Sequence, residues 1–117
     1  MYEVIPTDAF EKDIKYYMRK KKYTKILDDI QPIIVELEKG NFVGDEITGL
    51  ELPNNEHTYK VRAVNSTIKV GKSNGFRVIY YVVKDEREVY LLTIYSKKDQ
   101  ENITNNEIKS LIYANCI

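Results

Sequence analysis

The chain has 117 residues, enough for one compact domain with its own hydrophobic core. Hydrophobic residues make up 43% and charged residues 31% of the sequence, which excludes an intrinsically disordered chain. The 18 basic and 18 acidic side chains give a formal net charge of zero, which excludes a uniformly cationic nucleic-acid-binding coat.

The first 20 residues predict a strand followed by a helix. Residues 2–5 have the composition of a short edge strand, which Pro6 ends. Thr7 or Asp8 then caps a helix, because a short side-chain oxygen accepts a hydrogen bond from a free amide group of the first turn. The apolar stripe of this helix consists of Phe10, Ile14, Tyr17 and Met18.

A second helical pattern covers residues 26–37, and Gly40 is placed to end it. Pro32 lies inside the pattern and lacks an amide donor, so it predicts either a kink or the start of a new helix. The two helical segments together predict a helical hairpin. The apolar positions of the second segment are Ile26, Ile30, Ile33, Ile34 and Leu37.

The pattern changes from helix to strand after an acidic stretch, residues 41–56, that reads as a long loop. In residues 59–63 apolar and basic side chains alternate, which predicts a strand with one apolar and one basic face. Residues 71–75 have the composition of a turn. Residues 76–83 are almost continuously apolar and predict a central strand, and residues 89–95 predict another after a charged turn.

The last predicted element is a short helix. Thr104 and Glu107 have the spacing of a capping box, in which each side chain bonds to the other residue's backbone amide. Ile108, Leu111 and Ile112 supply its apolar face. The order of elements predicts an α+β fold, with an N-terminal helical hairpin packed on one side of a small, mainly antiparallel β-sheet and a C-terminal helix.

The sequence also indicates the compartment. Cys116 is the single cysteine, so no internal disulfide forms, and no cysteine or histidine cluster suggests a metal site. The first residues lack a basic region followed by an apolar run, and no apolar stretch approaches the roughly 20 residues that cross a bilayer. We therefore expect one cytoplasmic domain over residues 1–117, without a metal, another cofactor or a membrane partner.

The charges are segregated along the chain. Residues 26–56 hold eight acids and one base, whereas residues 57–84 hold six bases and no acid, and residues 12–25 hold seven bases and one acid. Basic side chains on a sheet without carboxylates repel one another unless an anion binds to them. Any one of these residues alone reads as a solvated cation, but the run without acids favours a phosphate-binding surface.

Four segments with distinctive motifs follow one another in the second half of the chain. Residues 60–62 read K-V-R, and residues 71–81 read G-K-S-N-G-F-R-V-I-Y-Y. Residues 90–99 read Y-L-L-T-I-Y-S-K-K-D, and residues 102–107 read N-I-T-N-N-E. In this order and spacing they resemble the RelE/ParE toxin superfamily, and most closely its HigB-like branch.

In that branch a K-x-R strand leads to G-K-S-G-G-x-R-x-I-Y-Y, followed by L-L-x-I-Y-x-K and L-T-x-x-E. The resemblance covers residues 44–112, and it extends to the helical hairpin in arrangement only. Asn74 stands in place of a second glycine. Thr104 stands where better-studied RelE members carry a tyrosine, so a tyrosine base cannot be assigned there.

The resemblance implies the toxin of a type II toxin–antitoxin system. Members of this branch cleave messenger RNA on the ribosome and are held inactive by a helix-turn-helix antitoxin. The expected partners are therefore a cognate antitoxin, the ribosome and mRNA. Tyr16, Tyr17 and Tyr23, which lie among lysines, are expected to contact the antitoxin.

Metal-free RNA cleavage begins with attack of the 2′-hydroxyl on the adjacent phosphorus. It needs a base, an acid and stabilisation of the charge on the phosphorane. Arginines suit the last task because a guanidinium binds two phosphate oxygens at once, and a lysine among other cations gives up its proton more readily. The candidate catalytic residues are Arg77, Arg62, Lys60, Lys72 and Lys97.

Arg77 and His57 each have a plainer interpretation. In the plainer interpretation, Arg77 forms an ion pair within the core. Glu88 on the next strand is then the acid that could reach it. His57, the single histidine, belongs to none of the four motifs and is expected to be an ordinary surface residue.

RNA binding is assigned to a second group of residues. The lysine run that ends the first helix is expected to dock RNA without taking part in the chemistry. Tyr95 is the candidate for stacking on a base, whereas most other strand tyrosines are expected to fill the core. The predicted RNA-binding residues are Lys20, Lys21, Lys22, Lys69, Tyr95 and Lys98.

Two other functions stay open from the sequence. A ParE-like toxin poisons DNA gyrase with the same fold and does not need a phosphate-directed cluster. A degenerate relative binds its antitoxin but does not arrest growth.

Overall fold

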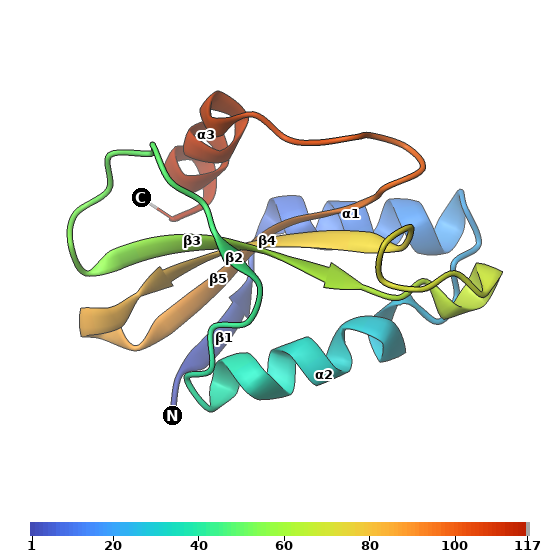
Figure 1. Ribbon diagram of the computed structural model, residues 1–117, viewed down its shortest axis with the longest axis horizontal. Helices are drawn as coiled ribbons and strands as arrows, with labels where there is room; N and C mark the ends of the chain where they lie inside the picture. Colours follow the sequence, from blue (N-terminus) through green and yellow to red (C-terminus); the bar gives the residue numbers. More distant parts are fainter. Residues whose placement is uncertain (117) are drawn as a thin grey trace.

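The computed structural model describes residues 1–116, and within them a five-stranded sheet is flanked by three α-helices (Figure 1). The strand order is β1-β5-β4-β3-β2, with β1 parallel to β5 and every other pair antiparallel. The predicted α+β fold is therefore confirmed. The elements are β1 (Glu3–Pro6), α1 (Asp8–Arg19), α2 (Ile26–Glu38), β2 (Asp45–Glu46), β3 (Glu56–Ala63), β4 (Phe76–Val83), β5 (Glu88–Ser96) and α3 (Asn105–Cys116).

Local sequence signals explain how the helical hairpin begins and ends. The Thr7 side chain accepts a hydrogen bond from the backbone N–H of Phe10, which caps α1, and its hydroxyl donates to the Leu91 carbonyl of β5 at 2.7 Å. Pro32 lies inside α2, which runs as one helix, so the predicted second helix start is wrong. Gly40, at a positive φ of 82°, follows the end of α2 as predicted.

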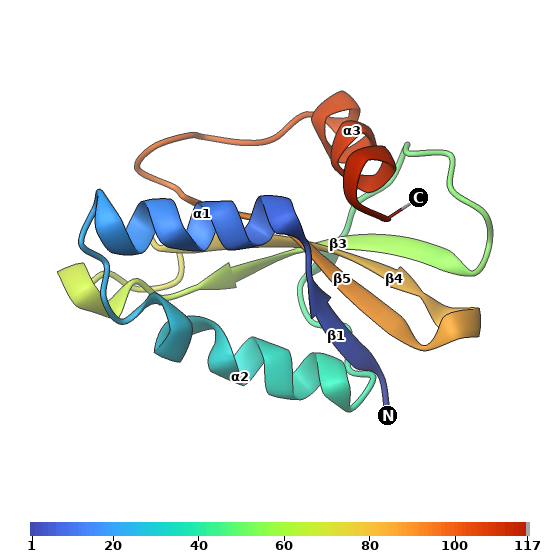
Figure 2. The same ribbon diagram turned by 180° about the vertical axis from the view of Figure 1, so that it is seen from behind.

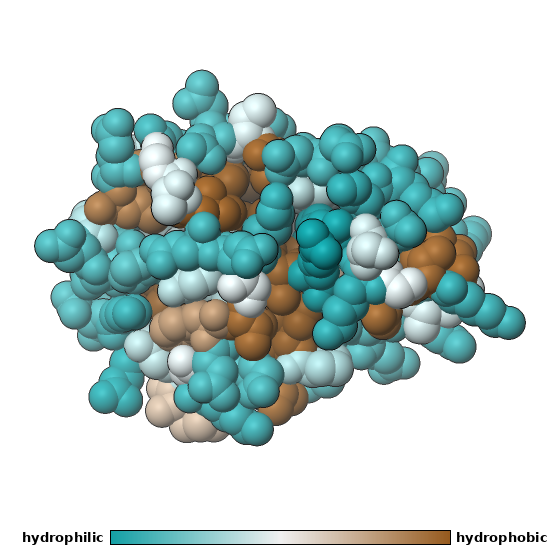
Figure 3. Space-filling model, viewed as in Figure 1, coloured by the Kyte–Doolittle hydropathy of each residue, from teal (hydrophilic) through white to brown (hydrophobic). Residues whose placement is uncertain are grey.

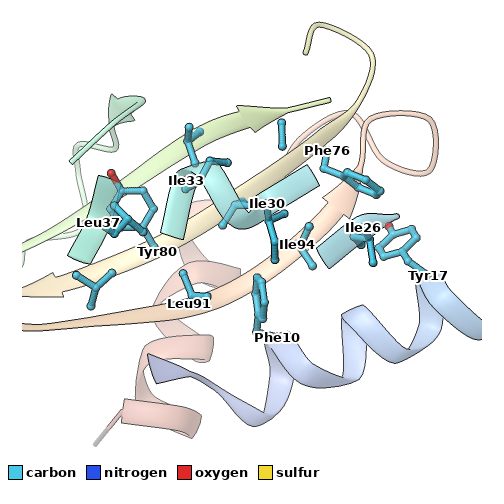
Figure 4. Packing of buried hydrophobic residues seen from close by; sticks show 14 of the residues in the cluster. Phe10, Tyr17, Ile26, Ile30, Ile33, Leu37, Phe76, Tyr80, Leu91 and Ile94 are labelled. Carbon is cyan, nitrogen blue, oxygen red and sulfur yellow. The ribbon is translucent and has the colours of Figure 1, made fainter. Parts of the chain in front are cut away.

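The sheet separates two hydrophobic clusters. Helices α1 and α2 pack on one face, called here the hairpin face, against side chains such as Phe76, Tyr80 and Ile94 (Figures 2 and 4). Helix α3 packs on the other, the α3 face, where Ile108 and Ile112 meet Ile79 and Leu92. Alternate residues of β4 therefore serve two cores, which explains why its sequence reads as a continuous apolar run.

The loop predicted at residues 41–56 contains β2, which pairs antiparallel with β3. This strand has only two residues, both acidic, so no apolar alternation in the sequence signals it. Between α2 and β3 lies a hollow of about 370 Å³, lined by apolar residues such as Ile33 and Val61 and also by Arg62 and Lys72. Hydrophobic residues show between hydrophilic ones on this side of the molecule (Figure 3).

The connection from β3 to β4 is tightly folded. Asn65 and Val70 exchange backbone hydrogen bonds, and residues 66–68 form one turn of 3₁₀-helix between them. Gly75 ends the predicted turn, and a Cβ there would lie 2.1 Å from the Ala63 carbonyl oxygen. Only glycine allows this close approach, which places the turn against the ends of both strands. Among residues 1–116, no helix has the length and apolar character to span a membrane.

Candidate functional site

The register of the three central strands brings the two predicted arginines together. Arg62 on β3 lies opposite Arg77 on β4, and Arg77 lies opposite Tyr95 on β5. Directly paired residues point to the same side of a sheet, here the α3 face. The prediction that Arg62 lies beside Arg77 is therefore confirmed. Two cations directly opposite each other are unfavourable unless something neutralises them.

Arg77 is only 4% exposed, and its guanidinium turns toward the β3–β4 turn. Nη1 donates to the carbonyls of Lys72 at 2.9 Å and Phe76 at 3.3 Å, and Nη2 donates to the Ser73 carbonyl at 3.0 Å. Arg77 thus holds the turn that carries Lys72. The sequence predicted that the Arg77 guanidinium contacts a phosphate directly. In the structure the guanidinium is buried and donates to backbone carbonyls instead.

The alternative reading of Arg77, an ion pair with Glu88, is wrong. Glu88 lies opposite Val83, at the far end of β4, and accepts a hydrogen bond from the Tyr90 hydroxyl at 2.9 Å. Within residues 1–116, no carboxylate lies within 4.0 Å of the Arg77, Arg62 or Lys72 side chains. Burying a guanidinium without a counter-ion costs folding free energy. The unpaired positive charge of Arg77 therefore marks this end of the sheet as a candidate functional site.

The other predicted catalytic cations gather near Arg77. Lys72 is exposed in the turn, and Lys97 directly follows β5, where its backbone N–H donates to the Gly75 carbonyl at 2.9 Å. Lys60 is half-buried and lies two residues before Arg62 on the same face of β3. We call this group the basic end of the sheet; its members are Lys60, Arg62, Lys72, Arg77 and Lys97.

Tyr95 does not have the environment that base stacking requires. The side chain is 3% exposed and belongs to the core of the α3 face, so neither side of the ring is open to a nucleotide. The predicted stacking role is wrong for this conformation. The Tyr95 hydroxyl is buried without a hydrogen-bond partner among the described residues. Burial raises the pKa of this hydroxyl, and the charge of Arg77 opposes the shift.

The predicted RNA-binding lysines are exposed, and most lie near the basic end. Lys21 in the run after α1 pairs with Asp99, with 3.1 Å between Nζ and Oδ1, and this carboxylate raises the pKa of Lys21. Because Asp99 follows β5 closely, this contact brings the lysine run beside Lys98 and the end of the strand. The exposed set is Lys20, Lys21, Lys22, Lys69 and Lys98.

Two of the three tyrosines predicted to contact an antitoxin lie in the core. Tyr17 and Tyr23 are buried and stack with their ring centroids 5.9 Å apart. The Tyr17 hydroxyl accepts a hydrogen bond from the Ser96 backbone N–H at 2.8 Å, and burial raises its pKa. Only Tyr16, which is 46% exposed, remains available to a partner.

Histidine chemistry is absent from the basic end. His57 lies near the opposite end of β3, where Nδ1 is 2.7 Å from the Glu46 carboxylate and Nε2 is 3.1 Å from the Asn54 carbonyl. In the part of the chain from residue 1 to residue 116, no three His, Cys, Asp or Glu side chains are placed to hold a metal ion.

Sequence reasoning missed the segment that joins β5 to α3. Asp99, Glu101 and Asn102 each contact a predicted cation, as detailed below. The available signal was the presence of two acids, Asp99 and Glu101, within three positions of Lys98. It also missed a groove of about 330 Å³ between α1, α2 and β1, whose apolar lining includes Val4, Ile14 and Leu27.

No protein-family model matches the chain. The resemblance to the RelE/ParE toxins therefore stays a prediction from the four motif segments.

Proposed function

We propose that the chain is a RelE/ParE-like toxin that cleaves mRNA on the ribosome without a metal ion. The observation that carries this proposal is the convergence of Arg62, Lys72, Arg77 and Lys97 on one end of the sheet. Three of these side chains have no carboxylate within 4.0 Å among residues 1–116. Such a surface is matched to a phosphodiester backbone.

We divide the catalytic tasks among the cations according to their exposure and contacts. Arg62 and Lys72 are exposed, so they are the side chains that bind the phosphate oxygens. Arg77 holds the turn under Lys72 and adds a fixed positive charge, which stabilises the phosphorane electrostatically. The 2′-oxygen bonds to phosphorus as the bond to the 5′-oxygen breaks. We assign the accompanying proton transfers to Lys60 and Lys97, which flank the two arginines.

The lysine run provides the docking surface in this proposal. Lys20, Lys21 and Lys22 are exposed at the end of α1, next to the basic end. Each phosphate contact made by such a lysine adds affinity that falls with salt, whatever the RNA sequence. This is the behaviour expected of a protein that binds the ribosome and takes its substrate position from it.

A cognate antitoxin is the partner that would restrain this activity. The groove between α1, α2 and β1 offers a docking surface on the opposite face from the basic end. Leu27 on its rim is 51% exposed, an unusual position for a large apolar side chain without a partner. We place part of the antitoxin contact there, in place of the buried Tyr17 and Tyr23.

The test is induction of the chain in growing cells, followed by primer extension on cellular transcripts. Cuts inside translated codons, lost in the double variant Arg62→Ala with Lys72→Ala, are the expected result. A loss of about 10²–10³ in cleavage rate is expected for removal of such charge-stabilising groups. Lys39→Ala with Lys84→Ala is the matched control, because it removes two exposed cations away from the basic end.

Three outcomes would contradict the proposal. Growth arrest without transcript cuts, unaffected by the double variant, would favour the gyrase-poisoning toxin. Absence of growth arrest and of cuts would favour the degenerate relative. Equal losses in the double variant and its control would show that general charge, rather than the basic end, is responsible.

A further inference from the structure

The segment between β5 and α3, residues 97–104, is called here the strap. It leaves the sheet at the end of β5 and returns over the α3 face to the start of α3 (Figures 1 and 2). Its polar side chains contact three of the predicted cations. Asp99 Oδ1 lies 3.1 Å from Lys21 Nζ, Glu101 Oε1 lies 3.4 Å from Lys97 Nζ, and Asn102 Oδ1 accepts from Lys60 Nζ at 3.4 Å.

The ends of the strap are fixed by backbone hydrogen bonds, and its middle is not. At its start the backbone amides of Asp99 and Gln100 donate to the Ser96 carbonyl at 3.0 and 3.2 Å. At its end Thr104 and Glu107 form the predicted capping box. In the described chain, no hydrogen bond between backbone groups joins residues 101–103 to the sheet. Side chains therefore hold this part of the strap.

In the middle, Asn102 accepts from Lys60 and Ile103 packs against the hydrophobic cluster of the α3 face. The two ion pairs of the strap, by contrast, are weak. The Glu101 side chain is 87% exposed, and the side chains of Lys21 and Asp99 are both partly open to solvent. Exposed ion pairs contribute little stability and are screened by salt, so a competing anion replaces them readily. The strap thus offers two carboxylates and one amide oxygen to cations that otherwise bind phosphate.

We propose that the strap is an internal competitor for RNA. Asp99, Glu101 and Asn102 place oxygen atoms on Lys21, Lys97 and Lys60, where phosphate oxygens of a bound RNA bind in their place. RNA binding then requires the middle of the strap to move away, because two carboxylates beside a phosphodiester repel it. This inference rests on the proposed function, since it concerns access to the basic end.

The competition predicts an unusual response to mutation. Neutralising the strap carboxylates leaves the cations unpaired and removes the repulsion, so RNA binds more tightly. A merely structural strap predicts the opposite, because loosening it disturbs the basic end and weakens binding. The sign of the change therefore separates the two roles.

The experiment compares full-length wild type with the double variant Asp99→Asn and Glu101→Gln. The probe is a 12-nucleotide single-stranded RNA with 2′-O-methyl groups, which the protein cannot cleave by 2′-hydroxyl attack. The matched control is Asp85→Asn with Glu86→Gln, which changes the net charge equally at the opposite end of the sheet. We expect the strap variant to bind about 5-fold tighter than wild type at about 0.1 M salt, and the control less than about 2-fold tighter.

Amide hydrogen exchange provides the second readout. Exchange of residues 101–103 in wild type is expected to stay fast when the RNA probe binds, because the displaced strap gains no protection, whereas most residues at an interface become protected. If RNA binds and the strap variant matches its control, or if these amides become protected, the competitor role is wrong and the proposed function stands. If no variant binds the RNA, the inference fails, whereas the proposed function is decided separately by the primer-extension experiment.

Discussion

The two faces of the sheet are built from the same strands but differ in how their charges are treated. On the hairpin face, aromatic and aliphatic side chains from α1 and α2 cover β4 and β5, and the half-buried Asp13 is satisfied by hydrogen bonds from Thr93 and Ile94. On the α3 face, one helix covers part of the strands, and Arg77 is buried without a carboxylate in the described chain.

This difference in charge between the two faces indicates which part of the domain is a candidate for function. Phe76 and Arg77 are neighbours on β4, yet one completes a core and the other leaves a buried positive charge. A buried charge without a counter-ion lowers stability, and such local conflicts concentrate at functional sites. The hairpin face therefore holds the larger hydrophobic cluster, and the basic end is the place where we propose the active site.

The largest expected effect is on the hairpin face. Phe76 is fully buried and packs edge-on against Tyr17 and Tyr23, with ring centroids 5.7 and 5.9 Å away. Phe76→Ala should lower the free energy of unfolding by about 3–5 kcal/mol, because it leaves a cavity between three rings. Denaturant unfolding measures the loss.

The control for this variant is Leu27→Ala, which removes an exposed side chain from the groove rim. We expect it to change the free energy of unfolding by less than about 1 kcal/mol. A similar loss in the two variants would mean that the aromatic cluster on the hairpin face is not the stabilising core.

An intermediate effect is expected for Arg77. Arg77→Ala should remove about 2–4 kcal/mol of transition-state stabilisation, enough to abolish growth arrest. It should also lower the free energy of unfolding by about 1–3 kcal/mol, because the Lys72 and Ser73 carbonyls lose their donors. Arg77→Lys should recover only part of the activity, since one ammonium group cannot reproduce the divergent contacts of a guanidinium. Growth arrest and a melting curve are measured on each variant.

Two results would contradict the role given to Arg77. A stable and fully toxic Arg77→Ala protein would show that the basic end is not the active site. Loss of toxicity that occurs only with unfolding would make the residue purely structural.

Much of the fold follows from short-range signals in the sequence. Three features depend only on residues close together in the chain, so the sequence predicts them directly. They are the Thr7 cap, the Thr104–Glu107 capping box and the alternation in residues 59–63. The parallel pairing of β1 with β5 has no such local signal, because it joins residues 85 positions apart, such as Glu3 and Glu88, through backbone hydrogen bonds.

The candidate site was predictable in its residue types but not in its detail. The strand pattern placed Arg62 and Arg77 side by side. The turning of Arg77 toward backbone carbonyls, and the burial of Tyr95, depend on tertiary packing that no spacing records. The same holds for Lys21 and Asp99, which are 78 positions apart and meet only because α1 ends beside the end of β5.

The smallest expected effect concerns the carboxylate of the hairpin face. Burial raises the pKa of Asp13 above its ordinary value, and hydrogen bonds from Thr93 and Ile94 oppose the shift only in part. Folding therefore favours the protonated form. That contribution is fully present below the ordinary pKa near 4 and is lost as the pH rises through the raised folded-state pKa. At pH 7 the ionised carboxylate lowers stability relative to a neutral side chain.

Asp13→Asn tests this sign, because an amide oxygen can accept both hydrogen bonds that now go to a single oxygen, Oδ2. The variant should be more stable than wild type at pH 7, by less than about 1 kcal/mol, and the difference should shrink as the pH falls toward 4. Asp8→Asn is the control. The Asp8 carboxylate in the first turn of α1 interacts favourably with the helix dipole, so its loss should lower the free energy of unfolding slightly. Denaturant unfolding between pH 4 and 7 measures both. If Asp13→Asn is instead less stable at pH 7, the hydrogen bonds from Thr93 and Ile94 outweigh the cost of burying the ionised carboxylate, and Asp13 stabilises the hairpin face.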